Sequence, residues 1–139
     1  MIELDEAVVV PTGSRLLGDF AIGVAATFAA LGVWLAWTQL GGVDLTVVSA
    51  GAVREVGAGA VTVTALLVSG AGILLVRLLE WWLPRGLRLW TVVACAVCAG
   101  SLVGPLGATT AAAGLGLTAL HATVGAIVVL GVRRVHRAG

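Results

Sequence analysis

Four long apolar stretches dominate the chain, at about 16–40, 56–83, 88–104 and 107–132. A helix that spans a bilayer needs about 20 predominantly apolar residues, with a range of about 17–25. Three stretches meet this length easily, and the third reaches it only when Arg88 and Gly104 are included. We expect helices and not barrel strands, because the stretches lack barrel-like alternation and a helix satisfies its own backbone hydrogen bonds in lipid.

Glycine and proline mark the connections between these stretches. Residues 41–42 end the first helix, while 84–86 and 104–107 separate the later ones. The two short connections make the last three helices antiparallel neighbours. The segment 41–55 is longer, and its β-prone run at 43–48 favours an external loop with a short hairpin. The predicted fold class is all-α: a transmembrane up-down four-helix bundle with one longer external loop between its first two helices.

The composition is that of a chain surrounded by lipid. Hydrophobic residues make up 60% of it and charged residues 11%, against about 25% charged residues in an ordinary soluble domain. Such a chain lacks the polar residues needed to cover a core in water. The net charge of +1 implies no bulk attraction to nucleic acid, so none is expected as a partner.

The arginines predict the orientation in the membrane. With four spans, seven of them fall on one side: Arg15, Arg77, Arg85, Arg88, Arg133, Arg134 and Arg137. Only Arg54 lies on the other side, so the positive-inside rule predicts that both chain ends face the cytoplasm of a multi-pass plasma-membrane protein. Residues 1–14 are then an acidic cytoplasmic segment, 15–134 the transmembrane domain and 135–139 a short basic tail. The first six residues carry no basic side chain, so we expect no cleavable signal peptide.

Small residues recur at helical spacing on three of the helices. Lipid offers no hydrophobic gain when helices associate, so faces that allow close approach are the usual contacts. The set on the fourth helix is Gly107, Thr110, Gly114, Thr118, His121 and Gly125. The other sets are Thr62, Ala65, Ser69, Gly72 and Val76, and Asp19, Gly23, Ala26 and Ala30. We expect the three faces to meet inside the bundle, although a composition rich in Gly and Ala would also produce such spacing.

His121 is the leading candidate for a ligand-binding residue. By helical rise it lies about 16 Å from the inner end of its helix, near the bilayer centre. Ionisable groups at that depth are costly and are functional candidates by default. We group it with Thr118, Ser69 and Ser101 as a candidate ligand-binding set. We favour a structural imidazole that is hydrogen-bonded to one of these hydroxyls over a ligand or proton site.

Asp19, Arg77, Glu80 and Arg88 form a second candidate set, at the cytoplasmic edge. Asp19 lies four residues after Arg15, and Glu80 lies three after Arg77, so each carboxylate has an arginine on its own helix face. We expect ion pairs that neutralise and anchor the helix ends. The alternative is a cytoplasmic gate whose ion pairs break on opening.

Cys95 and Cys98 have the spacing of a CxxC motif. Zinc would need a fourth ligand and deprotonated thiols, and a thiol oxidoreductase would need further cysteines or a longer loop. We therefore expect both cysteines to fill space as small apolar residues. The sequence also lacks a phosphate-binding loop, a catalytic triad and paired carboxylates. No catalytic residue, metal or cofactor is predicted, and we favour a non-enzymatic role.

Several short motifs occur in a recognisable order. They are 42–47, Leu79-Glu80, Trp90, 101–106 and 120–125. Over about 16–134 the chain resembles a family of short four-helix membrane proteins from high-GC bacteria that is classed only as a domain of unknown function. The resemblance implies the fold and leaves the activity open.

The leading functional hypothesis is a membrane protein that binds a lipid-like molecule or a membrane protein partner. One alternative is a transporter or channel subunit, which would need a homo-oligomer because a single four-helix bundle offers little room for an aqueous path. The other alternative, which we favour least, is a membrane thiol redox enzyme that uses the two cysteines.

Overall fold

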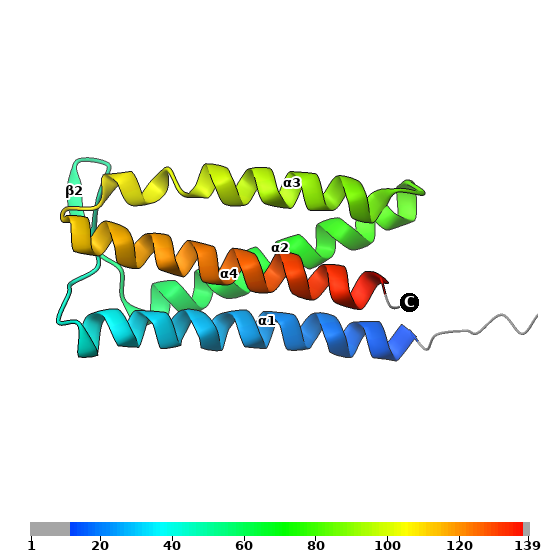
Figure 1. Cartoon of the computed structure of the whole chain (residues 1–139), viewed down its shortest axis with the longest axis horizontal. Coiled ribbons are helices and arrows are strands. Elements are labelled where there is room, and N and C mark those ends of the chain that lie inside the picture. The colour runs from blue at the N-terminus through cyan, green and yellow to red at the C-terminus, as the bar shows by residue number, and fades with distance from the viewer. Residues whose placement is uncertain (1–11, 138–139) are drawn as a thin grey trace, which may run out of the picture.

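The computed structural model describes residues 12–137, which form four long helices that run in alternating directions (Figure 1). They are α1 (Thr12–Leu35), α2 (Ala58–Trp82), α3 (Gly86–Ser101) and α4 (Ala111–Arg137). The π-helix Ala36–Leu40 continues α1, and the 3-10 helix Gly104–Gly107 follows α3. Each helix, with these extensions, is long and apolar enough to cross a membrane. The prediction of four apolar spans is confirmed.

The outer surface of the bundle is apolar. Phe20 and Phe28 on α1, Leu74 on α2 and Leu130 on α4 are each more than half exposed. A soluble protein rarely exposes large contiguous apolar patches. In a bilayer the same side chains contact lipid, so the chain is a multi-pass membrane protein.

Each helix packs mainly against two neighbours. α1 packs against α2 and α4, and α3 packs against the same two helices. α2 and α4 also touch, more sparingly, across the centre. Sequential helices are therefore neighbours in space, and the bundle closes when α4 returns to α1.

At the end where α1 begins and α4 ends, the core surrounds Trp90 of α3. Its side chain is 1% exposed, and its indole N–H donates a hydrogen bond of 2.8 Å to the carbonyl of Gly72 in α2. Val76, Val128 and Val132 pack in the same cluster. One directional hydrogen bond thus joins α3 to α2, which matters because lipid provides no hydrophobic drive for helix association.

The α1–α2 connection is a hairpin of β1 (Thr46–Ser49) and β2 (Ala52–Glu55), at the opposite end of the bundle (Figure 1). Ala50 and Gly51 form its two-residue turn, both with positive φ, as the right-handed twist of a hairpin favours. The hairpin also docks on the α3–α4 connection, since the N–H of Thr109 donates to the carbonyl of Thr46 at 3.1 Å. The fold is therefore mostly helical, and this loop pairs its own backbone groups in the hairpin.

Two tryptophans near the end of α1 hold the hairpin and α4 in place. The indole N–H of Trp34 donates to the carbonyl of Val56 at 2.8 Å, and that of Trp37 to the carbonyl of Ala112 at 2.9 Å. Gly116 of α4 makes room for this arrangement. A Cβ at that position would lie 2.5 Å from Cδ1 of Trp37 and 2.7 Å from a methyl carbon of Leu45, a buried side chain.

The small-residue faces expected on α1 and α2 point inward. The buried members are Asp19, Ala26 and Ala30 on α1, and Ala65, Ser69 and Val76 on α2. The large residues Leu67 and Leu74 of α2 are exposed.

The prediction for α4 is wrong, because the helix turns a different face toward the core. Its buried residues are Ala113, Gly116, Leu117, Leu120, Val128, Val132 and His136. The predicted face lies to one side, where a Cβ on Gly125 would lie 2.8 Å from the sulfur of Cys98 in α3. The small residues of α1 explain the difference, since Ala26 and Ala30 leave space for leucine and valine side chains from α4.

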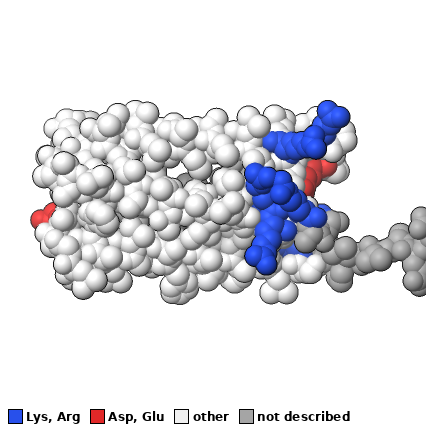
Figure 2. Space-filling model, in the orientation of Figure 1, with Lys and Arg blue, Asp and Glu red and all other residues white. Residues whose placement is uncertain are grey.

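Charge lies at the two ends of the bundle, and the middle is apolar. Figure 2 shows arginines gathered at the end of the bundle where α1 begins and α4 ends. We call this the arginine-rich end.

Gly116→Ala is expected to lower the free energy of unfolding by about 1–3 kcal/mol, because the added methyl group overpacks Trp37 and Leu45. Gly32→Ala on α1 is the matched control, since its Cβ would meet nothing within 4 Å. That change should leave stability unchanged or raise it by up to about 1 kcal/mol. Unfolding of the purified protein in mild detergent measures both, and equal stability of the two variants would contradict the close contact.

Candidate functional site

A buried polar cluster at the arginine-rich end joins three helices. Asp19 of α1, 4% exposed, lies between Arg77 of α2 and His136 of α4. Its Oδ2 accepts hydrogen bonds from Nε and Nη2 of Arg77 at 2.9 and 2.6 Å. Its Oδ1 lies 3.1 Å from Nε2 of His136, whose Nδ1 lies 2.7 Å from Oε2 of Glu80. We call these four residues the Asp19 cluster.

The imidazole of His136 lies between the two carboxylates of the Asp19 cluster. Both ring nitrogens face carboxylate oxygens, and an ionised carboxylate can only accept a hydrogen bond. Both contacts are therefore hydrogen bonds when the imidazole carries both protons. The cluster then holds two positive and two negative groups, an arrangement in which buried charges are paired.

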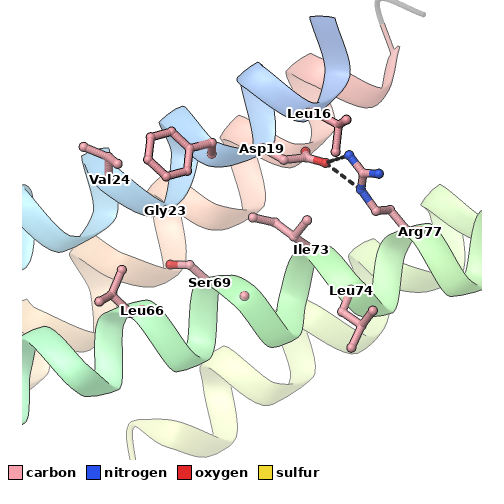
Figure 3. A pocket seen from close by; sticks show the side chains of 11 residues that line it. Leu16, Asp19, Gly23, Val24, Leu66, Ser69, Ile73, Leu74 and Arg77 are labelled. Atoms are coloured by element: carbon pink, nitrogen blue, oxygen red, sulfur yellow. Dashed lines mark hydrogen bonds and ion pairs between the residues drawn. The ribbon is translucent and has the colours of Figure 1, made fainter. Parts of the chain in front are cut away.

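A groove between α1 and α2 starts at the Asp19 cluster and runs toward the centre of the bundle (Figure 3). Its volume is about 450 Å³. The walls are mainly apolar, with Leu16, Val24, Leu66 and Leu74 among the lining residues. The Asp19–Arg77 ion pair forms its polar end.

Ser69 is the other polar group in the groove. Its side chain is 1% exposed, and its hydroxyl has no hydrogen-bond partner among residues 12–137. Gly23 of α1 faces it, and a Cβ there would lie 3.9 Å from Cβ of Ser69. Ser69 and Arg77 are eight residues apart on α2, about 12 Å by helical rise. A buried hydroxyl without a partner costs about 1–3 kcal/mol. A hydrogen bond to Ser69 would remove this cost.

The other members of the predicted ligand-binding set bond to their own helices. Nδ1 of His121 lies 2.7 Å from the carbonyl of Leu117, Thr118 donates to Gly114 at 2.8 Å, and Ser101 donates to Cys98 at 2.7 Å. Within residues 12–137 none of the three bonds to Ser69, and none lines the groove. Ser69 alone of that set lies in the candidate site.

The edge residues pair between helices and not along them. Arg77 bonds to Asp19 of α1, while Glu80 bonds to His136 of α4. The expected same-helix pairs of Asp19 with Arg15 and of Glu80 with Arg77 are absent from the described ion pairs. Arg88 is exposed and pairs with no carboxylate in residues 12–137.

Sequence reasoning missed His136, because α4 extends through the segment assigned to a basic tail. The signal was present: His136 follows Val128 and Val132 at four-residue intervals, and all three are buried. Helical spacing beyond Arg134 would have placed it on the inner face of α4.

Cys95 is exposed and Cys98 half-buried, and both are free thiols. In the described part of the chain, no group of three or more His, Cys, Asp or Glu side chains could hold a metal ion.

Residues 10–138 match a family described as a family of unknown function (DUF6069). No curated protein sequence and no solved structure is significantly similar to the chain.

Asp19→Asn is expected to lower the free energy of unfolding by about 2–3 kcal/mol. The value is at the low end for a broken buried ion pair, because Arg77 is 37% exposed and regains some hydration. Glu80→Gln should cost about 1 kcal/mol or less, since Glu80 itself is 28% exposed.

Asp44→Asn is the control, as this exposed carboxylate lies outside the cluster, before the hairpin. Denaturant or detergent unfolding of the four proteins ranks them. If Asp19→Asn were no more harmful than Asp44→Asn, the Asp19 cluster would not stabilise the bundle.

Proposed function

The chain belongs to this family of unknown function, and from that premise we propose that it is a non-enzymatic membrane protein that binds a lipid-like amphiphile in the α1–α2 groove. The observation that carries the proposal is the buried hydroxyl of Ser69, which has no partner in residues 12–137 and belongs to a residue that lines the apolar groove. A ligand that offers a hydrogen-bond acceptor there would remove the cost of the unpaired group.

The groove supports an elongated ligand with polar groups at two depths. Its volume of about 450 Å³ lies within the range of about 300–1,000 Å³ that is common for small-molecule sites. Apolar walls suit an acyl or isoprenoid chain, and a carbonyl or ether oxygen of the ligand would accept from Ser69. The polar head would lie at Arg77, which uses Nε and Nη2 for Asp19 and has further N–H groups to donate.

The proposed setting is the plasma membrane of a bacterium, with both chain ends in the cytoplasm. Seven arginines lie at one end of the bundle, and Arg54 of β2 lies at the other, which supports this orientation under the positive-inside rule. Trp81 and Trp82 at the arginine-rich end are mostly exposed, as is typical of residues at the membrane interface.

A reporter fused after Gly139 should read cytoplasmic, and a second one inserted in the hairpin turn at Ala50-Gly51 should read external. Four spans and the arginine asymmetry together require opposite signals at these two positions. The two fusion proteins are compared in living cells. Signals on the same side of the membrane would overturn the four-span topology, and reversed signals would overturn the orientation.

Gly70→Leu is expected to reduce the retained ligand by about tenfold or more, because the leucine side chain would fill the groove that Gly70 lines. Gly59→Leu is the matched control on the same helix, since both glycines have open space around a Cβ and only Gly70 lines the groove. Native mass spectrometry of protein released from its own membranes measures the adduct and the subunit number together. Equal adducts in the two variants would contradict the groove as the site.

Ser69→Ala provides a second test, because it should increase protein stability and decrease ligand retention. In delipidated protein it should raise stability by about 1 kcal/mol, because it removes an unpaired buried hydroxyl. In protein with its own lipids it should weaken retention of the ligand by about tenfold, a loss of about 1.4 kcal/mol. If Ser69→Ala raised the stability of the delipidated protein but left ligand retention unchanged or increased, Ser69 would not contact the ligand.

A further inference from the structure

A second cavity, of about 1070 Å³, opens at the arginine-rich end between the start of α1, the α2–α3 turn and the end of α4. Five arginines from these elements line it: Arg15, Arg85, Arg88, Arg133 and Arg137. The cavity is distinct from the α1–α2 groove, with which it shares no lining residue.

The arginines of this cavity are not neutralised by the described part of the chain. Among residues 12–137, the carboxylates at this end are Asp19 and Glu80, and the Asp19 cluster already pairs them with Arg77 and His136. None of the five lining arginines forms an ion pair with residues 12–137. A concave surface with five unmatched guanidinium groups concentrates positive potential and attracts an anion.

The fold adds to this potential. α3 begins at the cavity, and no side chain caps its N-terminus at Arg85. The positive end of the helix dipole therefore faces the same space as the guanidinium groups. Guanidinium forks bind phosphate oxygens through paired, charge-assisted hydrogen bonds, which makes phosphate the best-matched anion.

The surroundings favour a phosphate that is carried by a lipid. Leu83, Pro84 and Leu87 line the same cavity, and the exposed Trp81 and Trp82 lie just before it in the chain. Exposed tryptophans mark the depth of the lipid headgroups. An apolar wall beside the arginines suits the glycerol and upper acyl region of a phospholipid, which inorganic phosphate would leave uncovered.

We propose that this arginine-lined cavity binds the headgroup of an anionic phospholipid of the adjacent leaflet, with a preference for headgroups that carry two phosphates. Two phosphates match the number of the five guanidinium groups better than one does. The inference goes beyond the proposed function and does not depend on the groove, because the two sites use different residues.

The test compares Arg133→Gln with Arg134→Gln in the full-length chain. These neighbouring residues of α4 carry the same charge, but only Arg133 lines the cavity, and Arg134 is exposed. The detergent-solubilised protein is titrated in separate arms with diphosphatidylglycerol, phosphatidylglycerol, phosphatidylcholine and inorganic phosphate. Native mass spectrometry or tryptophan fluorescence follows binding.

We expect Arg133→Gln to weaken binding of diphosphatidylglycerol by about tenfold and Arg134→Gln to weaken it by about twofold or less, as an exposed charge does. Wild-type protein should prefer diphosphatidylglycerol over phosphatidylglycerol and bind phosphatidylcholine least. If the two variants lost the same amount of lipid affinity, general surface charge would explain the binding, and the proposed site would be wrong. If inorganic phosphate bound as tightly as the lipids, the proposal that the bound phosphate belongs to a lipid headgroup would be wrong.

The last control replaces the acidic side chains of the N-terminal segment. These are Glu3, Asp5 and Glu6, which lie outside the described residues. Their joint replacement by Gln, Asn and Gln should change lipid affinity by about twofold or less. A tenfold gain would mean that the chain's own N-terminal segment occupies the cavity, which would overturn the proposal. Loss of groove ligand in Gly70→Leu, with lipid binding at the arginines retained, separates the two sites.

Discussion

The carboxylate of Asp19 accepts hydrogen bonds from two helices other than its own, and the arrangement of the arginine-rich end depends on it. Oδ2 is bound by Arg77 of α2, and Oδ1 lies against His136 of α4. A buried carboxylate without such partners costs several kcal/mol, so Asp19 is tolerated only when these helices lie at the matching depth. Apolar contacts alone do not set that depth, because lipid and helix surfaces are equally apolar.

Directional hydrogen bonds recur at the opposite end, with different chemistry. Trp34 and Trp37 donate to backbone carbonyls of the α2 entry and of α4, and the hairpin bonds to the start of the α4 connection. Between the two ends, the helices meet through alanines of α1 and valines and leucines of α4. The bundle is thus held in register at its ends and packed closely in its middle.

The Asp19 cluster also separates the two proposed sites. Asp19 and Arg77 close one end of the α1–α2 groove, whereas Glu80 and His136 line the arginine cavity. His136 bonds to a carboxylate on each side, so the two sites share one hydrogen-bonded wall. The same four residues that hold α1, α2 and α4 together therefore shape the polar end of both.

Local properties of the sequence predict the four spans, their connections and the concentration of arginines at one end. Hydrophobicity, segment length and glycine or proline breaks are local properties, and the bilayer converts them directly into helices. The buried faces of α1 and α2 also followed from helical spacing. Membership of a family of unknown function agrees with this level of description.

Which residues meet depends on how the four helices pack together. Spacing along a helix pairs Asp19 with Arg15 and Glu80 with Arg77, but the observed partners are Arg77 and His136, on other helices. The sequence made His121 the leading candidate for ligand binding because of its depth in the membrane. In the structure, Ser69 lines the groove and His136 belongs to the Asp19 cluster. Contacts between helices depend on the rotation and depth of each helix, and these are set by the packing of all four together, which no single segment encodes.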